Sequence, residues 1–235
     1  MKRTLIMLSL CALFFGCTRE YGGVPTTRNY PVGGPFTGLD VSNAFHVTVS
    51  DQVTDVIVTV GELAHERVIV RVINGELQIG FKPNTRYNGI ATAIIPANAN
   101  LRELDLSGAS SFAGDLSGHD VDLDLSGAST FRGSVDADEI DIDLSGASNV
   151  FVDGHCQDKM EIDLSGASTL KAVALEAQSV SGHLSGASNA DVTVCSSLNV
   201  NLSGASILTY GTVSGECHPV VNCPCSGGSM VRPRR

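Results

Sequence analysis

VDLDLSGAS, residues 121–129, contains the two signals that recur along this chain of 235 residues. Its second half, Leu-Ser-Gly-Ala-Ser, occurs six times, and the copies start at Leu106, Leu125, Leu144, Leu164, Leu184 and Leu202. Successive copies are 18 to 20 residues apart. A fixed period of this size is typical of proteins in which one structural unit stacks repeatedly along an axis.

The residues that lead into the motif alternate between apolar and acidic. Val121, Leu123 and Leu125 alternate with Asp122 and Asp124, and the next two copies follow the same pattern. A period of two indicates a β-strand with one buried face, and a second short alternation follows the motif. A unit of 18 to 20 residues is too short for a strand, a helix and two loops. The sequence therefore predicts an all-β fold in which each repeat is one coil of a parallel β-helix, or solenoid.

The Ser-Gly-Ala-Ser part of each motif is expected to form the corner between two strands. Glycine adopts a positive φ without steric cost, so we expect positive φ at Gly127, Gly146 and Gly166. Alanine is small enough to lie inside a tight corner. The two serines would flank the corner and hydrogen-bond to turn backbone groups or to each other.

The region before the repeats, residues 36–98, contains strand-like runs without the motif, and Asn74-Gly75 between two of them is a hairpin signal. We predict that these runs form an N-terminal β cap of antiparallel or mixed strands over the open edge of the first coil. The expected organisation is a signal peptide at 1–16, a flexible Gly-, Pro- and Thr-rich tether at 17–34, the cap at 35–98, the solenoid at 99–215 and a Cys-rich basic tail at 216–235.

The first seventeen residues resemble a lipoprotein signal. Lys2 and Arg3 precede an apolar run, Leu5 to Phe15, that is too short to span a bilayer as a stable helix, and Gly16-Cys17 follows it. The resemblance implies cleavage before Cys17 and a lipid on that cysteine. The protein would then be anchored in the outer membrane, on its periplasmic or cell-surface side. The alternative is an ordinary secretory signal with an incidental cysteine.

Two further stretches carry a family resemblance. FTGLDVSNAFHVTV at 36–49 and NGELQI at 74–79, followed by the motif repeats, resemble the auto-transporter adhesin head GIN domain family over residues 35–215. The resemblance implies export, a β-helix and an adhesin-like role. No catalytic residues are established for that family, so the resemblance implies none here.

The acidic residues between the apolar ones should form two ladders on the outside of the rod, with neighbouring coils ~4.8 Å apart. The ladder residues are Glu103, Asp105, Asp122, Asp124, Asp141, Asp143, Glu161 and Asp163. One reading is a solvated face that keeps the rod soluble. The other is a face for a basic partner or for a cation such as Ca²⁺, which prefers oxygen ligands. The candidate residues for that face are Asp122, Asp124, Asp141, Asp143, Glu161 and Asp163, and no other cofactor is expected.

A polysaccharide hydrolase or lyase is the alternative function. Alternate acids on one strand would be roughly 6.5 to 7 Å apart, within the range of an inverting glycosidase. A catalytic pair should be singular, however, and these acids repeat; aromatic residues make up only 5% of the chain. Basic residues that would bind a uronate substrate are few in the repeats, namely Arg102, Arg132, Lys159 and Lys171. The motif serines do not match the Gly-x-Ser-x-Gly nucleophile elbow, so no catalytic residue is assigned.

The charge of the chain limits the class of partner. The formal net charge is −10, and loss of Lys2 and Arg3 with the signal would make the remainder more acidic. An acidic protein repels phosphate backbones, so nucleic acid is not expected as a partner. We expect a non-catalytic module that binds a glycan or a protein.

Beyond Cys11 and Cys17, five cysteines remain: Cys156, Cys195, Cys217, Cys223 and Cys225. Export favours disulfides, and we expect them to hold the tail over the open end of the solenoid. The connectivity cannot be deduced from sequence, and the odd number leaves one thiol free or intermolecular. The alternative is zinc bound by Cys217, Cys223 and Cys225 with His218, although the Cys-Pro-Cys spacing is atypical of zinc.

The lipoprotein signal predicts that cells incorporate a labelled fatty acid into the protein and that Cys17→Ala abolishes this labelling. The measurement is metabolic labelling followed by membrane fractionation. A wild-type protein that is unlabelled and released from the membrane would contradict the lipid anchor.

Overall fold

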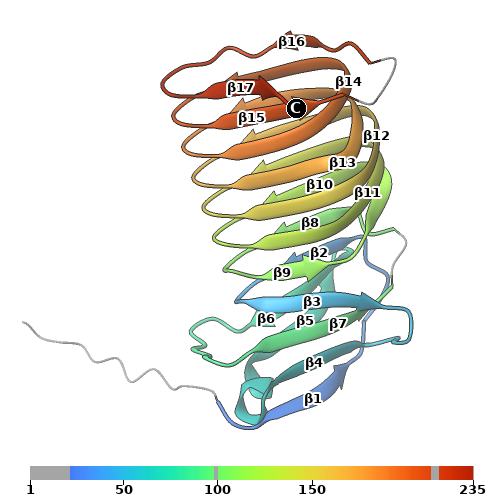
Figure 1. The fold of residues 1–235 in the computed structure, drawn as a ribbon. Helices are drawn as coiled ribbons and strands as arrows, with labels where there is room; N and C mark the ends of the chain where they lie inside the picture. The colour runs from blue at the N-terminus through green and yellow to red at the C-terminus, as the bar shows by residue number, and fades with distance from the viewer. Residues whose placement is uncertain (1–21, 98–99, 213–216, 235) are drawn as a thin grey trace, which may run out of the picture.

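The computed structural model describes residues 22–97, 100–212 and 217–234, which form one β-solenoid and confirm the predicted fold class (Figure 1). The signal peptide and Cys17 lie outside the described residues. The strands are β1 (Pro25–Tyr30), β2 (Gly38–Val41), β3 (Phe45–Ser50), β4 (Val56–Gly61), β5 (Val68–Ile73), β6 (Glu76–Phe81), β7 (Ala91–Pro96), β8 (Glu103–Leu106), β9 (Ser111–Ala113), β10 (Leu116–Leu125), β11 (Thr130–Leu144), β12 (Asn149–Leu164), β13 (Thr169–Leu184), β14 (Asn189–Leu202), β15 (Ile207–Gly211), β16 (Val220–Asn222) and β17 (Met230–Pro233). A short 3₁₀ helix, η1, spans Glu62–Arg67, and no helix among the described residues is long and apolar enough to cross a membrane.

The solenoid has two faces that meet at the motif corners. The strand segments before the corners form one face, which we call the acid face. The segments after the corners form the other, the post-corner face, which includes β3, β7, β9, β15 and β17 and lies in front in Figure 1. The inward residues before the corners, such as Leu123, Leu125 and Ile142, are at most 3% exposed. The alternation in the sequence is therefore the alternation between core and surface.

The parallel pairing of strands begins before residue 99, where the solenoid was predicted to start. β2 pairs in parallel with both β6 and β8, and β3 pairs in parallel with both β7 and β9. Residues 38–50 therefore form a coil that lies between the coil at 76–96 and the coil at 103–113. The region predicted as a separate cap is of mixed strand direction and is continuous with the solenoid. The hairpin at Asn74-Gly75 is confirmed, with antiparallel β5 and β6 and φ values of 53° and 86°.

The prediction of a tether is wrong for residues 25–30. β1 pairs antiparallel with β4 along its whole length and covers the N-terminal end of the rod. The Tyr30 hydroxyl lies 2.9 Å from His65 Nδ1, and His65 Nε2 lies 2.9 Å from the Thr26 carbonyl oxygen. The Gly-, Pro- and Thr-rich composition did not reveal this strand because its partner, β4, lies about thirty residues further along the chain.

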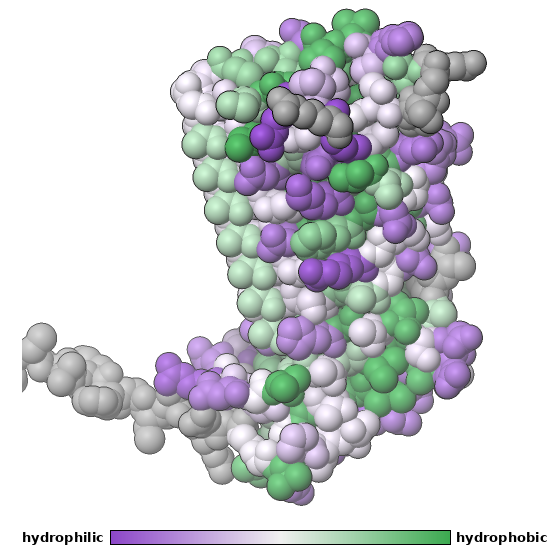
Figure 2. Space-filling model, in the orientation of Figure 1, coloured by the Kyte–Doolittle hydropathy of each residue, from purple (hydrophilic) through white to green (hydrophobic). Residues whose placement is uncertain are grey.

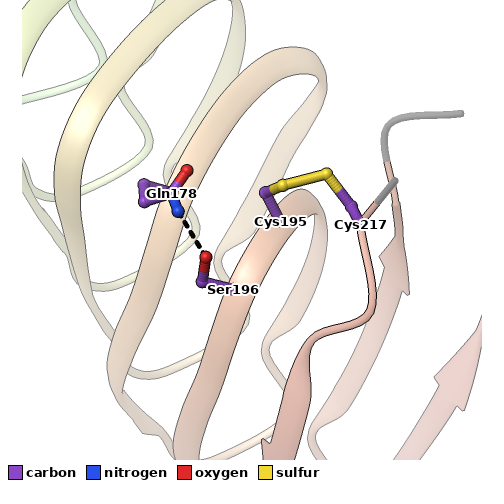
Figure 3. Close-up of a disulfide and its surroundings, with 4 residues drawn as sticks. All are labelled: Gln178, Cys195, Ser196 and Cys217. Atoms are coloured by element: carbon purple, nitrogen blue, oxygen red, sulfur yellow. Dashed lines mark hydrogen bonds between the residues drawn. A yellow bond between two sulfur atoms is a disulfide. The ribbon is translucent and has the colours of Figure 1, made fainter. Parts of the chain in front are cut away.

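The tail also adds to the solenoid. β16 pairs with β14, and β17 pairs with β15, both in parallel. Between them, Ser226 to Ser229 form a seventh corner, in which Gly227 has a φ of 67° and Ser229 Oγ donates to the Ser226 carbonyl oxygen at 2.7 Å. A disulfide between Cys195 and Cys217 holds this coil to β14 (Figure 3). Beside it, the Gln178 amide donates to the Ser196 hydroxyl.

The motif glycines have the predicted positive φ, for example 74° at Gly127, 69° at Gly146 and 70° at Gly166. A second constraint adds to this conformation. A Cβ at Gly146 would lie 2.4 Å from the carbonyl oxygen of Gly127 in the coil below. That same oxygen accepts a hydrogen bond of 2.8 Å from the Ala147 backbone N–H. Glycine therefore lets the ladder of hydrogen bonds continue through the corner.

The corner differs from the prediction in which side chain lies inside it. The motif alanines, such as Ala147, are exposed, and the second serine of each motif is at most 1% exposed. Ser148 Oγ donates to the Ser145 carbonyl oxygen at 2.8 Å, and the other motifs repeat this bond. A buried hydroxyl needs a partner, and the turn supplies one three residues earlier. The serine thus closes the corner from within.

Replacing Gly146 with valine should lower the free energy of unfolding by more than about 1 kcal/mol, because it strains φ and places a Cβ against the Gly127 oxygen. Gly75→Val is the matched control. Gly75 also has a positive φ, but a Cβ there meets no atom within 4 Å. Urea unfolding of both variants should show the larger loss at Gly146. A smaller loss at Gly146 than at Gly75 would contradict the stacked corner.

Candidate functional site

The acid face brings the predicted acidic residues into two straight ladders. The first, the Glu103 ladder, contains Glu103, Asp122, Asp141 and Glu161 on successive coils. The second, the Asp105 ladder, contains Asp40, Asp105, Asp124, Asp143 and Asp163. All six candidate residues lie in these ladders. Asp40 could not be placed from the sequence, because β2 enters the solenoid out of chain order.

Partners for these carboxylates lie toward the ends of the ladders. Glu161 contacts Lys159, Glu103 lies 3.5 Å from Arg102, and Asp163 Oδ1 lies 3.1 Å from His183 Nδ1. Beyond His183 the second ladder continues with Asn201, which is neutral. Among the described residues, no salt bridge reaches the four central aspartates, Asp122, Asp124, Asp141 and Asp143.

Burial and stacking raise the pKa of several of these carboxyls. Burial and the neighbouring charges of Asp40, Asp124 and Glu76 raise the pKa of Asp105 to about 6. Burial, followed by the charges of adjacent ladder acids, also raises the pKa of Asp141 and Asp143 above its usual range, and burial followed by the charge of Glu76 raises the pKa of Asp40. Two carboxylates ~4.8 Å apart repel by roughly 0.9 kcal/mol in water. Positive charge added at this surface should therefore stabilise the folded protein.

A shallow groove runs beside the Asp105 ladder. It has a volume of about 210 Å³ and is lined by Asp124, Asp143, Leu144, Ser145, Asp163, Leu164, Ser165, His183 and Ser185. One side carries carboxylates, and the other carries the first serines of the corners. A second hollow that shares His183 and Ser185 extends toward the C-terminal coil. The arrangement can hold an extended cationic group along the rod.

The ladders do not form a compact metal site. In the described part of the chain, no group of three or more His, Cys, Asp or Glu side chains is arranged around one point to hold a metal ion. Equivalent carboxylates are spread along the axis instead. Calcium at this face therefore stays a prediction, and it would have to bridge neighbouring coils.

The cysteines divide into one disulfide and three thiols among the described residues. Cys195 and Cys217 are bonded, as expected for an attachment of the tail, and this bond removes Cys217 from the alternative zinc set. Cys156, Cys223 and Cys225 are free. Cys156 is buried, and burial raises its pKa to about 11, so its thiol is unreactive near neutral pH.

The observations above define a β-solenoid with an acidic ladder on one face, and comparison with known proteins names its family. The chain belongs to the family described as "Putative auto-transporter adhesin, head GIN domain", whose model matches residues 35–212. A comparison with curated protein sequences found no match.

Solved structures share the fold. An adhesin-titled protein from Bacteroides fragilis is 15% identical, with a TM-score of 0.79, and the match covers 92% of this chain and 100% of the other. A protein from Parabacteroides distasonis titled as a lipid binding protein is 17% identical, with a TM-score of 0.71 and coverage of 92% and 99%. An adhesin-titled protein from the same species is 20% identical, with a TM-score of 0.64 and the same coverage. At these identities the likeness is one of fold.

The raised carboxyl pKa values predict that the protein becomes more stable as the pH falls from 7 toward 5. The folded-state pKa of Asp105 lies above the unfolded value of 3.8, so the folded state binds protons first in this range. The ionised Asp105 carboxylate destabilises the folded state fully above pH 6, and this destabilisation is lost as the pH falls through the folded-state pKa. Asp105→Asn should flatten this dependence. Chemical unfolding across pH measures it, and stability that decreases from pH 7 to pH 5 would contradict the stacked ladder.

Proposed function

We propose that the protein is a lipoprotein of the outer membrane, anchored through Cys17, that acts as a non-catalytic, adhesin-like binding module. Membership of an adhesin-like family supports a binding role. The rigid rod, with a long face of repeated chemistry, suits contact with an extended partner. The anchor rests on the Leu5 to Cys17 segment of the sequence.

The contact face that we propose is the acid face, and the observation that carries this proposal is the pair of unneutralised aspartates on each of two adjacent coils. Asp122 and Asp124 lie on β10, and Asp141 and Asp143 lie beside them on β11. A partner with lysine or arginine side chains would relieve their repulsion and fill the groove beside them. Calcium that bridges neighbouring coils is the simpler ligand of the same face.

The repeated surface also bears on the enzyme alternative. A hydrolytic pair of carboxyls acts at one place on an enzyme. The acid face instead presents an equivalent pair on each of β8, β10, β11 and β12. That repetition favours binding.

The test is the affinity of the full chain for biotinylated oligolysine at low salt. Replacing Asp122, Asp124, Asp141 and Asp143 with asparagine should weaken binding by about tenfold or more, since four charges at a few tenths of a kcal/mol each sum to that factor. A parallel thermal melt with calcium and with chelator should show a calcium-dependent rise only in the wild type.

The matched control replaces Asp51, Asp136, Asp153 and Asp158, which are exposed and lie off the acid ladders, with asparagine. This variant has the same net charge as the first. It should keep oligolysine binding within about twofold. Equal weakening in both variants would show a general charge effect and would contradict the acid face as a site.

A further inference from the structure

The post-corner face carries a column of charged and aromatic side chains that cannot be recognised in the sequence. Pairing of β9, β11, β12, β13, β14, β15 and β17 places one residue of each strand in line. From one end to the other these are Ala113, Arg132, Phe151, Lys171, Asp191, Thr209 and Arg232. We call the part from Arg132 to Arg232, together with Arg234, the basic strip. Two of the four basic residues of the repeats and two arginines of the tail meet in it.

A guanidinium lies over the aromatic ring of the strip. The Arg132 guanidinium carbon lies 4.3 Å from the centre of the Phe151 ring, and Lys171 is the neighbour of Phe151 on the next strand. Phe151 is 37% exposed, so the ring remains open to a ligand. A guanidinium over a ring is favourable, which holds both groups at the surface in fixed positions.

The single acid of the strip is already neutralised. Asp191 Oδ1 accepts hydrogen bonds from Arg234 Nε at 3.0 Å and from Arg234 Nη2 at 2.6 Å. Lys171 Nζ lies 3.6 Å from Asp191 Oδ2, and its side chain is 47% exposed. Four cations against one anion give the strip a formal charge of +3, on a protein whose net charge is −10. Positive charge is therefore gathered in this strip.

A neutral polar column runs beside the strip. It contains Ser111, Thr130, Asn149, Thr169 and Asn189, in line on β9, β11, β12, β13 and β14. Figure 2 views this face, and hydrophilic and hydrophobic residues alternate along the middle of the rod. The corners border the polar column on one side. Asp115 and Asp153, which lie two residues beyond Ala113 and Phe151, border the strip on the other.

We propose that the basic strip binds a single chain of an acidic polysaccharide, which lies along the axis of the rod. Arginine binds carboxylate or sulfate through paired N–H groups, and lysine binds them as a point charge. The exposed part of the Phe151 side chain contacts a sugar ring, and the threonines and asparagines beside it hydrogen-bond to sugar hydroxyls.

The dimensions of the strip support a single glycan chain. Arg132 and Lys171 lie two coils apart, roughly 10 Å along the axis, which is comparable with the length of a disaccharide. In a chain that carries a carboxylate on each sugar, two carboxylates separated by one sugar would therefore meet Arg132 and Lys171. The strip is one column wide, and the acids at its border repel a broader polyanion such as a nucleic acid duplex or an anionic membrane. The site does not depend on what the acid face binds.

The test measures binding of polygalacturonate oligomers to the full chain at low salt, with neutral dextran of similar length beside it. Arg132→Gln with Lys171→Gln should weaken polygalacturonate binding at least tenfold. The matched control is Arg102→Gln with Lys159→Gln, which removes the other two basic residues of the repeats from the acid face and should retain affinity within about twofold. Thermal melts of both double variants establish that they are folded.

The contribution of the Phe151 ring is tested separately, because substitutions of Phe151 leave the charge of the strip unchanged. Phe151→Ala should weaken binding several-fold, and Phe151→Tyr should restore it. Substitution of the four acid-face aspartates by asparagine should leave polygalacturonate bound, so that this site and the acid face can fail independently.

Four outcomes would overturn the proposal. They are an absence of polygalacturonate binding by the wild type, equal binding of dextran, equal loss in the two double variants, and tighter binding of single-stranded DNA of the same charge. The last would assign the strip to a different polyanion.

Discussion

Four of the six motif corners depend on one close contact, in which a motif glycine lies against the carbonyl oxygen of the glycine one coil below. A Cβ at Gly146, Gly166, Gly186 or Gly204 would be 2.3 to 2.5 Å from that oxygen. Without the Cβ, the next N–H reaches the same oxygen at 2.7 to 2.8 Å. The hydrogen-bond ladder therefore passes through the corner unbroken, and the coils keep one spacing along the repeats.

Because the coils keep one spacing, equivalent residues of successive repeats form columns on the surface of the rod. A residue at one position of a repeat lies beside the residue at the same position of the next coil, so that separations of 18 to 20 residues in the chain become direct contacts. The acid ladders lie on one side of the corners, and the basic strip lies on the other. An acidic protein thus presents a column of carboxylates on one face and a column rich in cations on the other.

The ends of the rod are completed by segments that do not follow the repeat. At the N-terminal end, β4 pairs antiparallel with β7, which ends the parallel ladder, and β1 pairs antiparallel with β4. At the C-terminal end, β16 and β17 add a last coil, and the disulfide between Cys195 and Cys217 holds it in place. Proline residues in this coil, Pro224 and Pro233 among them, lack the N–H that a further strand would need.

The sequence by itself determined the solenoid, the strands and corners of its six motif repeats, the positive φ of Gly127 and the acid ladders from Glu103 to Asp163. These follow from period-two alternation and an exact short motif, which are local signals. Only the tertiary structure decided that β2 lies between β6 and β8, that β1 is a strand, that the second serine closes each corner, and that Arg132, Phe151, Lys171 and Arg232 form one strip. Those features depend on which distant segments pair and in which register, and a hydrogen bond between backbones leaves no trace in the side chains of either segment.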